Sequence, residues 1–471
     1  MLENLKPYNV WKYFEKLCSI PHGSYNEKGI SDYVVQFAKE RNLEVYQDEV
    51  YNVIIIKEAS QGYEDKKPII LQGHMDMVCE KAPGSDFDFE KDSLILEVNG
   101  DYVSAKDTTL GGDDGIAVAM ELAILDDDTL QHPRLECIFT VSEEVGLDGA
   151  KALDTTPLKG NYLINIDSEE EGYFTVGCAG GCRVDISKEI KKVNKTGNLV
   201  KIKVDGLKGG HSGVEINKNL GNANKIMADV LKMIKDFDLI SLKGGSKDNA
   251  ITRVCEAAII VDPLKLSCIE ACNAYYKELY KLSDPDINIT YEVVGLKDVQ
   301  VLNAFDKDEL IWFMTNLSNG VMKMSKNIKG LPGTSSNLGV VNVDESIKLT
   351  TSLRSESIKD KETLLKAIKH MAALCNYTVN VRGDYPAWEY KEDSILREKM
   401  KEIYVSMYGK EPIVMSIHAG LECGILSSKI ENMDAVSIGP DMFDIHTYAE
   451  RISISSVERV YTFVLEVLKS L

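Results

Sequence analysis

The chain has 471 residues, 44% of them hydrophobic, and this length predicts two domains rather than one simple core. Its formal net charge of -20 disfavours binding to nucleic-acid phosphates and to anionic membrane surfaces, so a small or neutral substrate fits better. We expect a soluble cytoplasmic protein with reduced thiols, because the sequence has no apolar run of roughly 18 residues, no secretory signal and no CxxC pair among its ten cysteines.

The first informative element is a predicted strand that ends in polar residues. The segment from Pro68 to Val78, PIILQGHMDMV, begins as a buried apolar strand and then changes character. In an extended chain the side chains alternate between two faces, so His74 and Asp76 point the same way. One face at the end of this strand is therefore polar.

A glycine-rich bend and a helix follow along the chain. Residues 108–115, TTLGGDDG, lead into Ile116–Leu125, which is apolar nearly all round, as expected of a helix that is covered on most sides. The bend contains two adjacent aspartates, Asp113 and Asp114. For Asp114, a cap on the helix that begins at Gly115 and a contact to a metal both remain open.

Three further predicted strands lead into acidic or imidazole side chains. They are Leu135–Ser142, which leads to Glu143 and Glu144, Tyr162–Ile166, which leads to Asp167, and Ala435–Gly439, which leads through a loop to His446. Strands that alternate with a helix predict an α/β domain, a sheet flanked by helices. Ligands of such sheets gather beyond the carboxyl ends of the strands, where all these side chains are expected.

The convergence of these strand ends would place five carboxylates and two imidazoles in one crevice. Like charges at close range cannot all stay ionised without compensation. Divalent metal ions supply that compensation, and mixed imidazole and carboxylate ligands suit zinc, cobalt or manganese better than calcium or magnesium. Taken singly, each residue could instead be a cap or a surface acid.

The motifs GHMDMV, TTLGGDDG, TVSEEVG, NIDS and HTYAE resemble, in this order, metallopeptidases of the aminoacyl-histidine dipeptidase family, also called peptidase D. This family belongs to a larger di-zinc group that includes peptidase V and carboxypeptidase G. The segment His418–Gly424, HAGLECG, is similar to the form found in the aminoacyl-histidine branch. The resemblance spans nearly the whole chain.

The resemblance implies two zinc ions per subunit, with cobalt or manganese as substitutes. Asp113 would bridge the two ions. His74 and Asp167 would complete the ligands of one ion, and Glu144 and His446 those of the other.

The resemblance also implies catalytic roles in the same domain. Asp76 would hydrogen-bond the other ring nitrogen of the metal-bound His74, and Glu143 would be the general base for a water shared by the zinc ions. The residues alone do not distinguish Glu143 from Glu144, and the order of the family motif decides between them. We also expect a cis peptide bond between Asp113 and Asp114.

A second domain is implied between the two parts of the first. A zinc-peptidase-like catalytic domain, with a mixed sheet flanked by helices, would comprise residues 1–180 and 385–471, and an α+β lid domain residues 181–384. Leu199–Val204 and Ile347–Arg354 alternate as half-buried lid strands should. No internal repeat is visible in the sequence.

Four residues resemble lid or pocket residues that contact substrate. His211 in GGHSG would stabilise the oxyanion, in its own or in a partner's active site, and Arg354 would bind a substrate carboxylate. Asn249 and His418 would line the pocket. An exposed turn histidine, a strand-edge arginine, a loop amide and a helix-start histidine remain the alternatives.

The implied function is metal-dependent hydrolysis of dipeptides, with Xaa-His dipeptides such as β-alanyl-histidine preferred. One alternative keeps the metals but acts as an N-acyl-amino-acid deacylase or a tripeptidase. Another is a non-catalytic metal or small-molecule binding module in which the GGDDG loop cradles a ligand. A homodimer is compatible with the resemblance. Three histidines match no motif, and we expect them at the surface: His22, His132 and His370.

Overall fold

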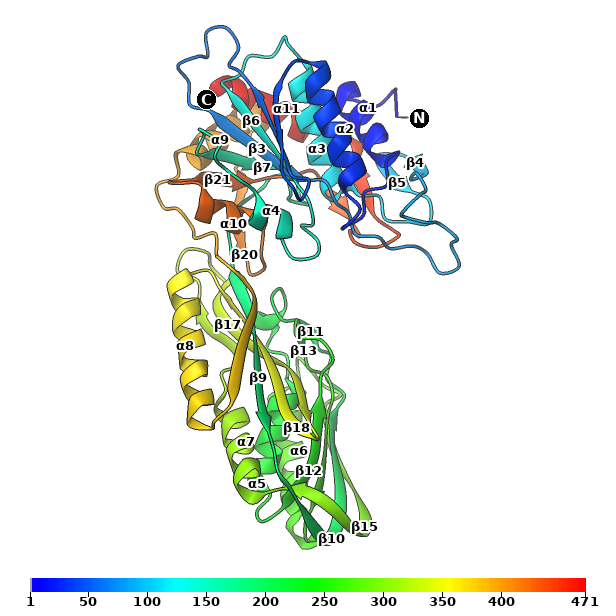
Figure 1. The fold of residues 1–471 in the computed structure, drawn as a ribbon, viewed down its shortest axis with the longest axis vertical. Helices are drawn as coiled ribbons and strands as arrows, with labels where there is room; N and C mark the ends of the chain where they lie inside the picture. Colours follow the sequence, from blue (N-terminus) through cyan, green and yellow to red (C-terminus); the bar gives the residue numbers. More distant parts are fainter. Residues whose placement is uncertain (1) are drawn as a thin grey trace. The chain divides into compact units, whose positions relative to one another are not determined.

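The computed structural model describes residues 2–471, which form two compact units (Figure 1). The first unit comprises the described part of Met1–Gly177 together with Tyr390–Ser416 and Leu421–Leu471. The second unit comprises Cys178–Glu389 and Ile417–Gly420.

The bounds of the second unit differ from the expected ones at both ends and at one later segment. It begins at Cys178 rather than at residue 181, and it ends at Glu389 rather than at residue 384. It also takes in Ile417–Gly420, which we expected in the first domain. The physical reason for this last difference is hydrogen bonding, because the Ile417 carbonyl accepts from the Ala179 N–H at 3.0 Å.

The first unit is built around an eight-stranded mixed sheet. Its strands, in spatial order, are β1 (Glu44–Gln47), β2 (Val53–Lys57), β6 (Leu135–Thr140), β3 (Ile69–His74), β7 (Tyr162–Asn165), β21 (Asp434–Ser437), β8 (Tyr173–Cys178) and β20 (Ile413–Ile417). The four central strands β6, β3, β7 and β21 are parallel, and all their residues are buried. A parallel sheet needs cover on both faces, which explains the continuous apolar runs in these strands.

Seven helices surround this sheet in the described part of the first unit. They are α1 (Tyr8–Cys18), α2 (Lys28–Glu40), α3 (Gly112–Asp126), α4 (Asp148–Ala152), α9 (Ile395–Tyr408), α10 (Glu422–Lys429) and α11 (Ile454–Ser470). Helix α3 packs against α1 and β3, and every residue from Ile116 to Leu125 is at most 1% exposed. The nearly all-round apolar pattern therefore predicted a central helix correctly.

A small four-stranded sheet carries the last motif of the first unit. Its order is β22 (Met442–Phe443), β23 (Arg451–Ser453), β5 (Tyr102–Ala105) and β4 (Leu96–Asn99). His446 lies in the loop between β22 and β23, which pair antiparallel. This hairpin fixes the two ends of the loop that holds His446.

The second unit contains a nine-stranded antiparallel sheet. Its main path is β15 (Asn288–Leu302), β10 (Lys192–Asp205), β14 (Cys255–Ile260), β12 (Asp238–Gly244), β17 (Pro332–Val343), β18 (Ser346–Ser355), β9 (Gly180–Glu189) and β19 (Thr378–Tyr385), with β16 (Gly320–Met324) beside β17. Four helices share one hydrophobic core with these strands: α5 (Ala223–Met233), α6 (Ser267–Leu279), α7 (Ala304–Asn316) and α8 (Ile358–Leu374). The expected α+β fold is confirmed.

The topology reveals a repeat that the sequence does not show. Apart from the short strands β11 (Gly210–His211), β13 (Ala250–Ile251) and β16, the elements β10-α5-β12-β14-α6-β15 and β9-α7-β17-β18-α8-β19 follow the same order of strand, helix, strand, strand, helix, strand. The first set lies in the chain between β9 and α7. In both, the spatial order of the strands is fourth, first, third, second, read from the edge of the sheet inward. The halves meet where their second strands, β12 and β17, pair antiparallel, with Leu242 opposite Val343.

A membrane-spanning segment is not found among residues 2–471. No helix there combines the length and the apolar character that crossing a bilayer requires.

Candidate metal centre and active site

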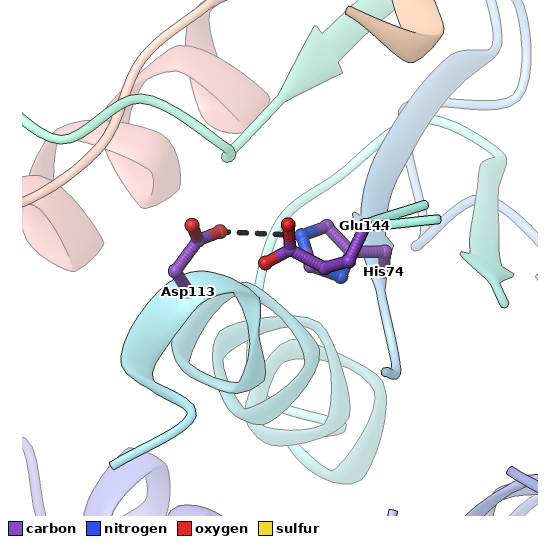
Figure 2. Close-up of side chains that lie close together, drawn as sticks. All are labelled: His74, Asp113 and Glu144. Atoms are coloured by element: carbon purple, nitrogen blue, oxygen red, sulfur yellow. Dashed lines mark hydrogen bonds and ion pairs between the residues drawn. The ribbon is translucent and has the colours of Figure 1, made fainter. Parts of the chain in front are cut away.

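The carboxyl ends of the parallel strands bring together His74, Asp113 and Asp167. His74 is the last residue of β3 and is 1% exposed. Its Nε2 lies 3.2 Å from Asp113 Oδ1 and 3.7 Å from Asp167 Oδ1. Asp113 lies in the first turn of α3, and Asp167 lies two residues beyond the end of β7. Figure 2 shows His74, Asp113 and Glu144 pointing toward one another.

His446 approaches the same aspartate from the other side. Its Nε2 lies 3.1 Å from Asp113 Oδ2 and 2.8 Å from Glu144 Oε1. The two carboxylate oxygens of Asp113 therefore face two different imidazoles. Such an arrangement suits a carboxylate that bridges two cations.

Two groups of donor atoms among residues 2–471 are compact enough to hold a cation. One consists of His74, Asp113 and Glu144, and the other of His74, Asp114 and Asp167, with the donor atoms of each group within 4.8 Å of one another. Four of the five residues that we expected as metal ligands belong to these groups, and the fifth, His446, contacts Asp113 and Glu144.

Asp76 contacts both His74 and the loop that carries the two glutamates. Its Oδ1 accepts the N–H of Glu143 at 3.0 Å, and its Oδ2 accepts the N–H of Glu144 at 3.3 Å and the hydroxyl of Ser24 at 2.8 Å. The Nδ1 atom of His74 lies 3.0 Å from the Asp76 backbone oxygen and 3.5 Å from its carboxylate. The nearer acceptor for the ring is thus the backbone oxygen, while the carboxylate orders the glutamate loop.

Asp114 does not cap the helix, so that alternative is wrong. It is buried, and its Oδ2 accepts the backbone N–H of His74 at 3.2 Å. Its Oδ1 has no hydrogen-bond partner in the structure. The expected cis peptide bond between Asp113 and Asp114 is confirmed. Burial raises the pKa of Asp114 well above its usual value.

Within the described part of the chain, the acids of this cluster have no positively charged partners other than histidine. Burial raises the pKa of Glu143 and of Asp167 well above the usual values. Burial acts on Asp113 as well, but hydrogen bonds with His446 and His74 hold its pKa below its usual value. Among residues 2–471, the ion-pair partners of the three acids Asp113, Glu144 and Asp167 are these two imidazoles.

The imidazoles respond in the opposite direction. Hydrogen bonds with Asp113 and Glu144 raise the pKa of His446 to about 10. Burial lowers the pKa of His74, but hydrogen bonds with Asp113 and Asp76 outweigh it and raise that pKa well above its usual value. Bound protons thus relieve the crowded negative charge. Divalent cations would relieve it directly, and the imidazole nitrogens and carboxylate oxygens fit such ions.

The second unit fixes the position of His211 and determines which of its ring nitrogens carries the hydrogen. His211 is in β11 (Gly210–His211) and pairs with Ala250 of β13 (Ala250–Ile251). Its Nδ1 accepts the N–H groups of Gly213 at 3.3 Å and of Val214 at 3.2 Å. Burial, followed by the charge of Arg354, lowers the pKa of His211. Because Nδ1 accepts these two hydrogen bonds, the neutral ring carries its hydrogen on Nε2.

Gly213 allows three of the expected substrate-contacting residues to lie together. A Cβ atom at this glycine would lie 2.6 Å from the backbone oxygen of His418, 3.0 Å from His211 Cε1 and 3.1 Å from Arg354 Nε. The last glycine of GGHSG is thus required by close approach, since any side chain there would displace these groups. Within the second unit, His211, Arg354 and His418 form one cluster.

Arg354 and His418 are both held by neighbouring hydroxyl groups. Arg354 Nη1 donates to the Tyr385 hydroxyl at 3.2 Å, and its buried Nε has no hydrogen-bond partner among the described residues. His418 Nε2 lies 2.7 Å from Ser335 Oγ, and burial together with Arg354 lowers the pKa of His418 to about 4. His418 is not a helix-start residue, because α10 begins at Glu422.

Asn249 lies next to the strand that pairs with His211. Its backbone oxygen accepts the N–H of Ser212 at 2.9 Å. The neighbouring Asp248 accepts from Arg183 at 3.0 Å and from Arg382 at 2.8 Å, which anchors this loop to β9 and β19. Contacts among the described residues assign the Asn249 side chain no role, so its part in substrate binding stays a prediction.

Sequence reasoning missed a buried glutamate beneath the cluster and misplaced two histidines. Glu422 accepts from Gln72 Nε2 and from Thr140 Oγ1, both at 2.6 Å, and burial raises its pKa to about 7. Its position inside HAGLECG was the available signal. His22 and His132 are 3% and 2% exposed, contrary to expectation, whereas His370 is exposed.

Comparisons with known proteins agree over nearly the full chain. The family model "Peptidase family M20/M25/M40" matches residues 70–470. The cytosol non-specific dipeptidase of Escherichia coli (strain K12) is 36% identical over 481 residues, which cover 100% of this chain and 99% of that protein. The solved aminoacylhistidine dipeptidase of Vibrio alginolyticus has a TM-score of 0.92 and 34% identity, covering 100% of this chain and 98% of that one. The aminopeptidase PepT from Bacillus cereus shares the fold, with a TM-score of 0.58, 16% identity and 99% coverage of both chains.

Proposed function

The chain belongs to peptidase family M20/M25/M40 and is therefore a hydrolase, and we propose that it cleaves dipeptides, with Xaa-His dipeptides such as β-alanyl-histidine preferred. The observation that carries the proposal is Asp113, whose two oxygens face two different imidazoles. The names of two relatives support the substrate class, since one is a non-specific dipeptidase and the other an aminoacylhistidine dipeptidase. The first of these names also places that relative in the cytosol, and we propose the same compartment here.

The proposed metal centre holds two zinc ions, and cobalt or manganese suits the same ligands. His74 and Asp167 would hold one ion and Glu144 and His446 the other, with Asp113 bridging them. When bound, the ions supply a Lewis acid for the peptide carbonyl and lower the pKa of a water.

Glu143 is the proposed general base of the reaction. Its backbone is fixed by the Asp76 carboxylate, and burial raises the pKa of its own carboxyl group. A raised pKa suits a group that accepts a proton from the attacking water and later delivers it to the leaving amine. Asp76 is the residue that holds this base in place.

The second unit supplies the proposed substrate contacts. His211 carries a hydrogen on Nε2 that can stabilise the oxyanion, either in its own active site or in that of a homodimer partner. Arg354 has a buried Nε without a partner, which suits recognition of a substrate carboxylate. Asn249 and His418 complete the proposed pocket.

Removal of the metal tests the proposed function directly. Treatment with a strong chelator should abolish hydrolysis of β-alanyl-histidine, because the crowded acids then lack the cations that organise them. Back-titration with zinc should restore the activity, with saturation at two equivalents per chain. The measurement is release of free histidine as a function of added zinc.

The same assay separates the alternatives. Parallel reactions with an N-acetyl amino acid and with a tripeptide should be slow compared with the dipeptide. Full activity in the presence of the chelator would contradict the metal centre, and faster release of acetate than of histidine would favour the deacylase.

Arg354→Ala should raise KM for dipeptides about 10- to 100-fold with little change in kcat. The reason is the loss of a charge-assisted hydrogen bond to the substrate carboxylate in ground state and transition state alike. Steady-state kinetics measure both constants. Arg459→Ala, which removes an arginine bound to Glu171 in the first unit, is the control and should leave KM unchanged. A fall in kcat at constant KM would assign Arg354 to the transition state instead.

A further inference from the structure

The glycine-rich loop before Asp113 encloses the carboxylate of Glu450. Its Oε2 accepts the N–H of Leu110 at 2.8 Å and of Gly111 at 3.2 Å. Its Oε1 accepts the N–H of Gly112 at 2.8 Å and of Asp113 at 3.4 Å. Glu450 is 3% exposed, so these four backbone donors take the place of water around a buried carboxyl group.

The glycines of the TTLGGDDG motif explain how the loop forms this cradle. Gly111 has a φ of 67°, a left-handed conformation in which glycine carries no penalty, and it precedes the first turn of α3. A Cβ at Gly112 would lie 3.2 Å from Glu450 Oε1. The N-terminus of a helix attracts anionic groups, and at α3 the chain itself supplies the carboxyl group of Glu450. The GGDDG donors are thus occupied, which argues against a loop that cradles an external ligand.

Glu450 also belongs to the loop that carries His446. Its N–H donates to the Thr447 carbonyl at 3.1 Å, and strand β23 begins at the next residue. The Glu450 carboxylate therefore links the backbone of Asp113 to the loop that carries His446. The side chains of these two residues are in contact, with His446 Nε2 3.1 Å from Asp113 Oδ2.

We propose that Glu450 is a positioning residue of the metal centre, which holds Asp113 and His446 at the separation that a shared cation requires. The inference rests on the proposed function. Glu450 touches neither substrate nor metal in this scheme, and it acts through the backbone of residues 110–113. Its effect should therefore be seen first in metal binding.

Glu450→Gln tests the proposal through zinc affinity. The amide retains one oxygen, but its NH2 group would face two of the backbone N–H groups, which opens one side of the cradle. The expected result is zinc binding weakened about 10- to 100-fold, the range typical of groups that orient metal ligands. Competition with a chromophoric chelator measures the affinity without any use of activity, and KM at saturating zinc should stay near that of the wild type.

Glu136→Gln is a matched control in the same unit. Glu136 is fully buried and accepts backbone N–H groups of Lys159 and Gly160 at 2.9 to 3.0 Å, but it lies near the start of β6, away from the strand end. This variant should lower the unfolding temperature of the metal-free protein and leave zinc affinity unchanged.

The possible outcomes are distinct. A Glu450→Gln protein with wild-type zinc affinity and only a lower unfolding temperature would show a purely structural role and overturn the proposal. If that variant does not fold, Glu450→Asp is measured in the same way, because it keeps the charge but is one methylene too short for the cradle; wild-type affinity there also overturns the proposal. Wild-type protein that binds no zinc would contradict the proposed function itself.

Discussion

Glu143→Gln is expected to lower kcat for dipeptide hydrolysis about 100- to 10,000-fold while both metal ions stay bound. The amide cannot accept a proton from the attacking water, and general-base catalysis commonly contributes a factor of this size. The ions should remain because Glu143 belongs to neither of the two groups of side chains that could hold a cation. These groups consist of His74, Asp113 and Glu144, and of His74, Asp114 and Asp167. The measurements are kcat under saturating substrate and metal content by elemental analysis.

The adjacent glutamate provides the matched control. Glu144 Oε1 lies 2.8 Å from His446 Nε2, so Glu144→Gln should weaken one of the two metal sites. Loss of metal in the Glu143 variant, with metal retained in the Glu144 variant, would show that the two roles are exchanged.

Asp113→Asn is expected to reduce hydrolysis to the background rate and to lower bound zinc below two equivalents. Asp113 offers Oδ1 toward His74 and Oδ2 toward His446, so one substitution affects both proposed sites. The amide has the same size but presents a donor where a second anionic oxygen stood, and it leaves less negative charge to hold the cations. Metal content and activity are measured on the same preparation.

Asp126→Asn controls for a general effect on helix α3. Asp126 is the last residue of this helix and accepts from Arg41 at 2.6 Å. This variant should change stability only slightly and keep both ions. An Asp113→Asn protein with two tightly bound ions and near wild-type turnover would rule out a bridging role.

The parallel strand ends explain why the sequence predicted the cluster of proposed metal ligands well. His74 is the last residue of β3, and Glu144 and Asp167 lie shortly after the carboxyl ends of β6 and β7. Parallel strands place those ends at one edge of the sheet, so correct strand assignment was enough to bring the side chains together. The roles of the neighbouring Glu143 and Asp76 came only from family resemblance.

The hydrogen-bond partners of the Asp114 and Glu450 carboxylates could not be predicted from the local sequence. An aspartate before a helix usually caps it, but the chain turns so that Asp114 accepts from the backbone of His74 on β3. Glu450 is the last residue of the polar motif HTYAE, and local sequence would place such an acid at the surface. Its four donors lie about 340 residues earlier in the chain, and only the folded structure brings them to it.

The repeat in the second unit is a further feature of the tertiary structure alone. Sheet order and pairing show the two halves, whose second strands meet at β12 and β17. Many side chains satisfy the same alternation of buried and exposed positions, so similar folds need no visible similarity in sequence.

By itself, the sequence determined which chemical groups stand at the ends of which strands, because strand and helix periodicity is local and depends on neighbouring residues. The tertiary structure decided which backbone donors meet Glu450, where Asp114 points, and where the second unit begins and ends. These depend on hydrogen bonds between residues far apart in the chain, which form only after the elements pack and exclude water from the groups between them.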